Sequence, residues 1–317
     1  MDRRTFIQTG SSCAAYLTAW GSLLPTALRR SFAAERFGRV VADEPWGRIE
    51  KIGERVWGLI STPLATGPDV RRTLCNGGIV AGRNGVAVIE GLASDAGAEW
   101  MMGQVRLLTG RRPTHVILSH YHGDHSGGLG AYRRTDGATP AFVTTTVTRG
   151  RLTPTGAPAQ ILADAQLVDG DSPATVDLGG VKLTITPRAG HTPSDLTIGV
   201  DDPPVVFAGD LLWNGMFPNY RDAIPSVLSR SVREMLRGEG TRVPGHGPIP
   251  KPADATNYVA VIDLVEQAAR RAVAAGTPMD AAAKEFSIPE SLGKWVLFSD
   301  RYFLVALQAW EKELTAR

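Results

Sequence analysis

The sequence lacks the features that define several classes of protein. It has two cysteines in 317 residues, too few for a disulfide scaffold. Its 34 lysines and arginines nearly balance its 32 aspartates and glutamates, and no polybasic block is present, so a nucleic-acid partner is not expected. No internal repeat or low-complexity tract occurs. Apolar residues make up 43% and charged residues 21%, the balance of a globular protein rather than a disordered one.

The first 34 residues differ from the rest in composition. Arg3 and Arg4 precede an uncharged stretch that continues to Arg29 and contains two glycines and one proline. This stretch is only mildly apolar, whereas a membrane span needs about 20 strongly apolar residues. We therefore predict a twin-arginine signal peptide over residues 1–34, which the twin-arginine translocation machinery would read, and a periplasmic location for the remainder. An uncleaved N-terminal anchor is the alternative.

Removal of this segment would leave a nearly neutral chain with one cysteine. Four arginines and one aspartate lie in residues 1–34, so the formal charge would change from +2 to −1. Cys13 would leave as well, and Cys75 would have no partner for an internal disulfide. We expect no stable membrane span in this mature chain. An exported protein without a disulfide needs another source of stability, and a tightly bound metal is one candidate.

Residues 35–317 are predicted to form one catalytic domain in which most strands precede the helices, with residues 255–317 as a helical C-terminal extension. An Asn-Gly pair between two apolar runs predicts a hairpin. The order predicts an α/β fold with antiparallel sheets and helices outside. The predicted strands are Arg48–Glu50, Val56–Ile60, Gly78–Gly82, Val86–Glu90, Thr114–Leu118, Val181–Ile185 and Val205–Ala208, and the predicted helices run from Ser94 to Gly110, over Ser226–Arg237, over Asn257–Ala275, after Pro278 and over Leu297–Leu314.

The densest group of ligand-type side chains is the stretch His-Tyr-His-Gly-Asp-His at residues 120–125, directly after a predicted buried strand. Residues two apart in an extended chain face the same way, so His120 and His122 can bind one ion. The glycine that follows lets the chain turn, which brings Asp124 and His125 towards a second ion beside the first. Four ligand-type residues in six positions at a strand end predict a metal site rather than core or surface.

Three further residues stand in similar places. His191 and Asp210 each follow a predicted strand, and His246 lies between two glycines after a predicted helix. Each is weak evidence alone, but in this order and with the first cluster they form a consistent set of metal ligands. His115 is different, because it lies inside a predicted buried strand, and we expect it to be a hydrogen-bonded structural histidine.

The motifs His-x-His-x-Asp-His, Gly-His-Thr, Gly-Asp and Gly-His-Gly, in this order, resemble the metallo-β-lactamase superfamily. The resemblance implies an αββα sandwich of two mixed sheets, with metals at one edge and additional C-terminal helices. It implies two Zn²⁺ per chain, with iron or manganese as alternatives. Glu90 stands where the family often carries aspartate, and we assign it no supporting role. By resemblance, the first zinc would be held by His120, His122 and His191, the second by Asp124, His125 and His246, and both by Asp210.

This resemblance implies metal-assisted hydrolysis of a small-molecule substrate. Two zinc ions share a hydroxide whose pKa falls towards ~7. Asp124 would bind a metal and also orient this nucleophile or pass its proton, so it is the predicted catalytic residue. By the same resemblance, Asp210 favours glyoxalase II-like thioesterases, lactonases, sulfatases and phosphodiesterases over true β-lactamases, which generally lack a bridging aspartate. We therefore expect an ester, thioester or lactone substrate.

Other functions of the same site stay open. They include β-lactamase, sulfatase and phosphodiesterase activity, and a non-catalytic, metal-holding accessory of a periplasmic redox system. A redox di-iron protein is disfavoured, because such relatives usually carry glutamate at the position of His122. The stretches 191–196 and 207–214 are similar to exported hydrolases linked to periplasmic quinoprotein and sulfur-oxidation systems.

Four aromatic residues near these motifs are candidates for a substrate pocket, although we expect at least half of them to lie in the core. They are Tyr121, Trp213, Phe217 and Tyr220.

Overall fold

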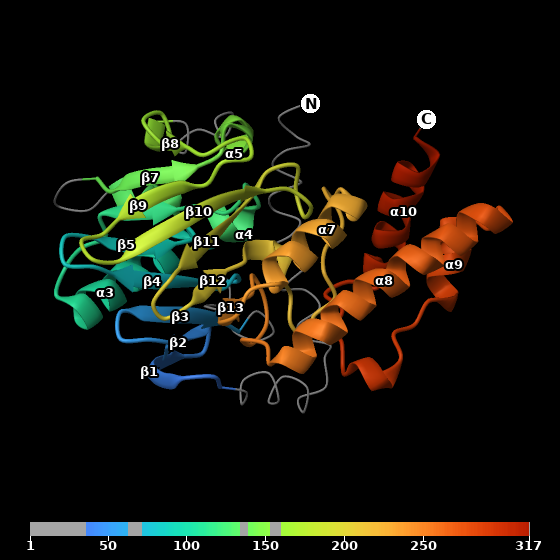
Figure 1. Ribbon diagram of the computed structural model, residues 1–317, viewed down its shortest axis with the longest axis horizontal. Coiled ribbons are helices and arrows are strands. Elements are labelled where there is room, and N and C mark those ends of the chain that lie inside the picture. Colours follow the sequence, from blue (N-terminus) through green and yellow to red (C-terminus); the bar gives the residue numbers. More distant parts are fainter. Residues whose placement is uncertain (1–35, 63–71, 134–138, 153–159, 317) are drawn as a thin grey trace.

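Two β-sheets and their flanking helices make up the computed structural model of the chain (Figure 1). The structure describes residues 36–62, 72–133, 139–152 and 160–316. The predicted signal peptide, residues 1–34, lies outside these ranges. The predicted α/β class is confirmed.

The first sheet has eight strands that follow one another in chain order. Strands β1 to β5 are antiparallel, and β5 to β8 are parallel. The predicted Asn-Gly hairpin joins β4 to β5, where the Gly82 amide donates to the Gly85 carbonyl at 2.9 Å. The sequence did not predict β1. The strands are β1 (Arg39–Glu44), β2 (Gly47–Lys51), β3 (Val56–Ser61), β4 (Gly77–Ala81), β5 (Val86–Ile89), β6 (His115–Ile117), β7 (Ala141–Thr144) and β8 (Gln166–Leu167).

The second sheet has five strands in the order β13-β12-β11-β10-β9. All neighbours are antiparallel except β12 and β13, which are parallel because a helix connects them. The strands are β9 (Ala174–Asp177), β10 (Lys182–Arg188), β11 (Asp195–Val200), β12 (Val205–Phe207) and β13 (Thr241–Val243).

The two sheets pack face to face through one apolar layer. Ile60 and Ile117 enter it from the first sheet, and Ile185 and Ile198 enter it from the second. All four side chains are fully buried. Because side chains alternate between the faces of a strand, the neighbours of these residues point outwards, where helices cover them. This arrangement is the predicted sandwich.

Helix α3 (Asp95–Thr109) covers the outer face of the first sheet. The Ser94 hydroxyl accepts from the Gly97 amide at its start, and Gly110 ends it in a left-handed conformation, as the sequence predicts. Met101 and Val105 pack on the sheet. Short helical turns follow the strands of this sheet: α4 (Gly123–Ser126), η1 (Leu129–Arg133) and α5 (Thr146–Leu152).

The remaining helices pack against one another and against the outer side of β12 (Figure 1). Two of their predicted starts were wrong. Helix α8 (Pro252–Ala275) begins five residues before the predicted start, because Pro252 is suited to a first turn and the Lys251 amide donates to the Asp254 carboxylate. The last helix begins at Tyr302 and not at Leu297, because the chain before it pairs through a β-bridge at Val296 with Met216. The helices are α7 (Pro225–Leu236), α8 (Pro252–Ala275), α9 (Met279–Glu285) and α10 (Tyr302–Thr315), with the short turns η3 (Gly209–Leu211) and η4 (Glu290–Leu292).

Within the described ranges, no helix has the length and apolarity that a membrane crossing requires.

Candidate metal centre

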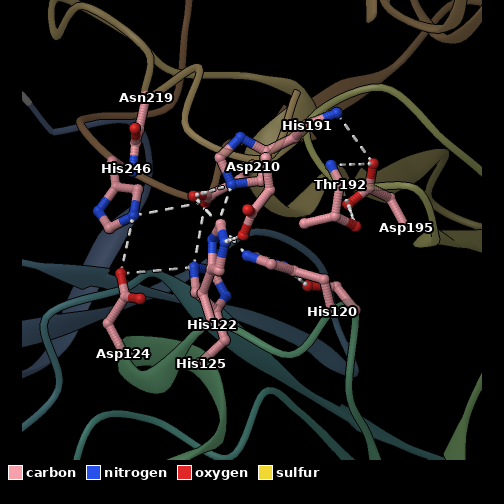
Figure 2. Close-up of polar contacts among 12 residues, drawn as sticks. His120, His122, Asp124, His125, His191, Thr192, Asp195, Asp210, Asn219 and His246 are labelled. Atoms are coloured by element: carbon pink, nitrogen blue, oxygen red, sulfur yellow. Dashed lines mark hydrogen bonds and ion pairs between the residues drawn. The ribbon is translucent and has the colours of Figure 1, made fainter. Parts of the chain in front are cut away.

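The seven predicted ligands come together at one edge of the sandwich, where strands from both sheets end (Figure 2). The stretch 120–125 follows β6 of the first sheet. His191, Asp210 and His246 follow β10, β12 and β13 of the second sheet. The site therefore lies between the two sheets, and each sheet supplies part of it.

Two glycines allow the first ligand segment to fold back against α3. His122 precedes the turn α4, which carries Asp124 and His125. A side chain at Gly127 would overlap with the Ala93 carbonyl, and one at Gly128 would overlap with the Ser94 carbonyl. The backbone therefore comes close to residues 93 and 94 at both glycines, where a larger residue would not fit.

The first group of ligands consists of three histidines and one aspartate: His120, His122, His191 and Asp210. The atoms that these residues offer to a metal lie within 4.8 Å of one another. His191 Nε2 is 3.0 Å from His122 Nδ1 and 3.2 Å from Asp210 Oδ2. His120 Nε2 is 3.9 Å from the same Asp210 oxygen.

The second group consists of Asp124, His125 and His246. His246 Nε2 lies 3.2 Å from Asp124 Oδ2, and His125 Nε2 lies 3.7 Å from it. The other Asp210 oxygen, Oδ1, is 3.1 Å from His125 Nε2 and 3.4 Å from His246 Nε2. Asp210 thus presents one oxygen to each group, which is the position of a bridging ligand.

The electrostatics of the site follow from burial and from the mutual proximity of these groups. Burial alone would raise the pKa of the Asp210 carboxyl, but the neighbouring histidines outweigh burial and hold this pKa well below its usual range. Burial likewise opposes ionisation of Asp124, yet His125 and His246 lower its pKa to about 2. Burial and neighbouring histidines lower the pKa of His120. Both carboxylates are therefore ionised at neutral pH and His120 is neutral, the forms in which these residues bind a metal. Against the effect of burial, Asp210 and Asp124 raise the pKa of His246 to about 9, so a metal ion would displace a proton from that ring.

Several of the converging atoms are buried without a hydrogen bond. Among the described residues, His120 Nε2, His125 Nε2, His246 Nε2 and Asp210 Oδ1 find no hydrogen-bond partner. Buried polar atoms of this kind are costly unless another group satisfies them. Nitrogen lone pairs directed at carboxylates are what a divalent cation requires, and a mixed N/O donor set suits zinc as well as iron or manganese. The residues therefore fit two metal ions.

Three of the ligand histidines have a polar partner for the ring nitrogen that faces away from the group. Ser119 Oγ is 2.9 Å from His120 Nδ1, Glu90 Oε1 is 3.2 Å from His125 Nδ1, and Asp222 Oδ2 is 2.9 Å from His122 Nε2. Such contacts fix the orientation of a ligand ring and its tautomer.

None of these three partners was predicted from the sequence. Glu90 received no supporting role there, but the structure places it against His125 and the Ser119 amide. Asp222 lies in the loop before α7, outside every motif, and no local signal pointed to it.

Other side chains hold the ligand loops in place. Asp195 accepts from the amides of His191 and Thr192, each at 3.0 Å. The Asn76 side-chain amide donates to the carbonyls of Pro244 at 2.9 Å and Gly247 at 2.7 Å, on either side of His246.

His115 lies at the start of β6, whereas the ligand cluster follows the end of that strand. Its Nδ1 is 2.8 Å from Thr114 Oγ1, and its half-burial lowers its pKa. It is less buried than the sequence suggested.

Most of the candidate pocket aromatics are core residues, as expected. Trp213, Phe217 and Tyr220 are buried in the helical core. Tyr121 is 8% exposed, and its ring lies 5.2 Å from that of His122. The Arg151 guanidinium stands 5.5 Å from the centre of the Tyr121 ring. Buried rings therefore cover the site on the Trp213 side, whereas the Asp222 side chain, beside His122, is 39% exposed.

Comparisons with known proteins agree with this fold and site. Residues 70–273 match the metallo-beta-lactamase superfamily. The chain belongs to this superfamily, and the predicted class of enzyme, a metal-dependent hydrolase, agrees with it.

The relatives found are distant in sequence. A hydroxyacylglutathione hydrolase from Cereibacter sphaeroides (strain ATCC 17025 / ATH 2.4.3) is 28% identical over 124 residues, which are 39% of this chain and 44% of that protein. Among solved structures, the metallo-beta-lactamase from Pontibacter korlensis has a TM-score of 0.56 at 18% identity, and the match covers 68% of this chain and 99% of that one. The metallo-beta-lactamase from Erythrobacter litoralis has a TM-score of 0.54 at 18% identity, covering 71% and 98%. These structures share the fold.

Proposed function

We propose that this chain is an exported dinuclear zinc hydrolase that cleaves an ester, thioester or lactone in a small molecule. The observation that carries the proposal is the position of Asp210. Its two oxygens face two separate groups of ligands, which a site for a single ion would not need.

Bound at the two groups, zinc ions would act as Lewis acids and lower the pKa of a water molecule towards ~7. The protein's own contribution is to fix the ligands and to move a proton. Asp124 is ionised at neutral pH, since its pKa is lowered to about 2 by His125 and His246 against the effect of burial. Asp124 Oδ2 faces His246, so this carboxylate can orient the attacking water and accept or pass its proton.

The charge of the ligand set supports a substrate with a polarisable carbonyl. Asp124 and Asp210 are the anionic ligands in the two groups, and the other five ligands are histidines. Two carboxylates leave two divalent cations with a net positive charge, which favours an oxygen atom that becomes negative during acyl transfer.

The kind of acyl compound is proposed from Asp210 and from the curated relative. Asp210 stands in the bridging position, where true β-lactamases generally have no aspartate. The hydroxyacylglutathione hydrolase matched by part of this chain favours a thioester among the acyl substrates.

A substrate panel tests this proposal. The metal-loaded protein should cleave a thioester, a lactone or an aryl ester faster than penicillins or cephalosporins, and aryl sulfates and phosphodiesters complete the panel. Metal analysis should find two zinc ions per chain. Turnover of nitrocefin above that of every ester and thioester would refute the proposed substrate class.

Export belongs to the same proposal and rests on Arg3 and Arg4 before a neutral, mildly apolar stretch. These residues lie outside the described ranges. Zinc bound in the cytoplasm would suit this route, because the twin-arginine machinery passes folded proteins.

A further inference from the structure

Two of the five ligand histidines lack the polar partner that orients the others. Among the described residues, His125 Nδ1, His191 Nδ1 and His246 Nδ1 find no hydrogen bond, although all three residues are fully buried. The Glu90 carboxylate lies 3.2 Å from His125 Nδ1, and no such ion-pair partner faces the other two nitrogens. A metal-bound histidine usually donates its far N–H to an oxygen, which fixes the ring. Another kind of contact must therefore hold these two rings.

Aromatic packing supplies that contact, above all at His246. The Trp213 ring lies 4.2 Å from the His246 ring, at an interplanar angle of 42°. The Phe298 ring lies 6.0 Å from Trp213 and 6.3 Å from His246, at steep angles to both. Trp213 and Phe298 are at most 2% exposed. The three rings pack against one another, which restricts rotation of the imidazole about its own bond.

The backbone holds the same residues together. The Asn214 amide donates to the His246 carbonyl at 3.0 Å, so residues 213–217 run beside the ligand loop. On the other side, the Val296 amide donates to the Gly215 carbonyl at 3.0 Å, and the Phe217 amide donates to the Val296 carbonyl at 2.9 Å. The segment that carries Phe298 is thus fastened to the loop that carries His246.

Phe298 comes from a part of the chain outside the family match. That match ends at residue 273, and the solved metallo-beta-lactamases above cover about 70% of this chain. The contact with His246 is therefore a feature of the C-terminal helical extension and not of the sandwich alone.

We propose that Phe298 is a positioning residue for His246, through which the C-terminal extension sets the affinity of the second metal position. Phe298 acts by packing against Trp213 and His246 and does not touch substrate. The inference rests on the proposed two-metal function. It predicts that loss of the Phe298 ring weakens the ion held by His246 and leaves the ion held by His120 and His122 unchanged.

The test is a zinc titration of the full-length apoprotein against a competing chelator, which yields a Kd for each ion. In Phe298→Leu, the second ion should bind about 10-fold more weakly or worse, the range seen when contacts behind a metal ligand are lost. Phe298→Tyr keeps the ring and should restore the affinity. Phe298→Met, which fills similar volume without a ring, carries the test if the leucine variant does not fold.

Phe303→Leu is the matched control. Phe303 lies in the same extension and contacts two aromatic rings, those of Phe217 at 4.9 Å and Phe286 at 4.8 Å, but no histidine. It should lose thermal stability and keep both metal affinities. Wild-type affinity for the second ion in the ringless Phe298 variants, or an equal loss in Phe303→Leu, would overturn the inference. A wild-type chain that binds a single ion would overturn the two-metal function and this inference with it, whereas two ions without ester hydrolysis would overturn only the proposed activity.

Discussion

At the scale of single residues, Asp210 is shared by the two groups of ligands. This shared residue distinguishes the site from a pair of independent metal sites. Its carboxylate presents one oxygen to each group and would offset the repulsion between two cations bound there. We expect Asp210→Ala to lower the zinc content from near two towards one per chain and to reduce kcat by several orders of magnitude. Metal analysis and turnover of the best substrate measure both effects.

His115→Ala is the control for this change. His115 makes one side-chain contact with Thr114 and lies away from the ligand cluster, so its loss should cost about 1 kcal/mol of stability and no metal. If Asp210→Ala kept two ions and most activity while His115→Ala lost them, the site would be wrongly assigned.

Asp222 is the residue whose effect on the first ion can be separated from direct coordination. Its carboxylate lies 2.9 Å from His122 Nε2, while His122 Nδ1 faces His191. Asp222→Ala should weaken binding of the first ion by about 10- to 100-fold, and Asp222→Asn, which still accepts a hydrogen bond, should weaken it less. Chelator competition gives both values.

An exposed aspartate provides the comparison for Asp222. Asp263 pairs with Arg233 on the helices, and Asp263→Ala should leave metal binding unchanged. Equal affinities in wild type and Asp222→Ala would show that His122 needs no partner.

The ligand residues could be predicted from the sequence, but their supports could not. The ligands at 120–125 can be recognised because four ligand-type residues occur in six positions. His191, Asp210 and His246 can be recognised because they lie next to glycines or at the ends of strands. Asp222 reaches His122 across 100 positions of the chain, and nothing in its neighbourhood distinguishes it from a surface aspartate. Glu90 was passed over because its type differed from the expected one, although the longer side chain reaches His125.

At the scale of secondary structure, the loop after β13 is held in place by a side chain from another part of the chain, Asn76. The Asn76 amide bonds the carbonyls on both sides of His246, and its oxygen accepts from the Ser61 amide at 2.8 Å. We expect Asn76→Ala to lower the free energy of unfolding by about 3 kcal/mol, because two buried carbonyls lose a hydrogen-bond donor. The substitution should also weaken binding of the second ion. Denaturant unfolding and zinc titration measure the two effects.

Asn84→Ala provides the comparison, because Asn84 lies in the exposed β4–β5 turn. The free energy of unfolding of this variant should lie within about 0.5 kcal/mol of the wild-type value. An Asn76 variant with wild-type stability and metal affinity would show that the loop keeps its shape unaided.

The elements themselves were largely predictable where local signals are strong. The hairpin, α3 with its caps and α7 follow from Asn-Gly, from Ser94 and Gly110, and from apolar periodicity. The last helix was predicted to begin at Leu297 because the apolar residues 297 and 298 continue the pattern of α10. The chain before Tyr302 instead pairs at Val296 with residues 215–217, a contact that the sequence does not display.

At the scale of the whole molecule, the predicted export signal can be tested independently of the fold. Arg3→Lys combined with Arg4→Lys should leave the precursor in the cytoplasm, because the translocation machinery reads the arginine pair. Cell fractionation and immunoblotting measure the distribution. Lysine substitution at Arg29 and Arg30 is the matched control, because it also replaces two arginines without changing the charge, and it should not affect export. An unchanged periplasmic yield after the first substitution would remove the basis for export.

The origin of the ligands has a mechanical consequence. Each group contains ligands from both sheets. In the first group, His120 and His122 follow a strand of the first sheet and His191 follows a strand of the second. In the second group, Asp124 follows a strand of the first sheet and His246 follows a strand of the second. Each bound ion would therefore be a cross-link that closes a long loop of the chain and restricts the unfolded ensemble, as a disulfide does elsewhere. Such a link responds to chelators and to acid instead of to reductants. The sandwich would then resist opening only while the ions stay bound.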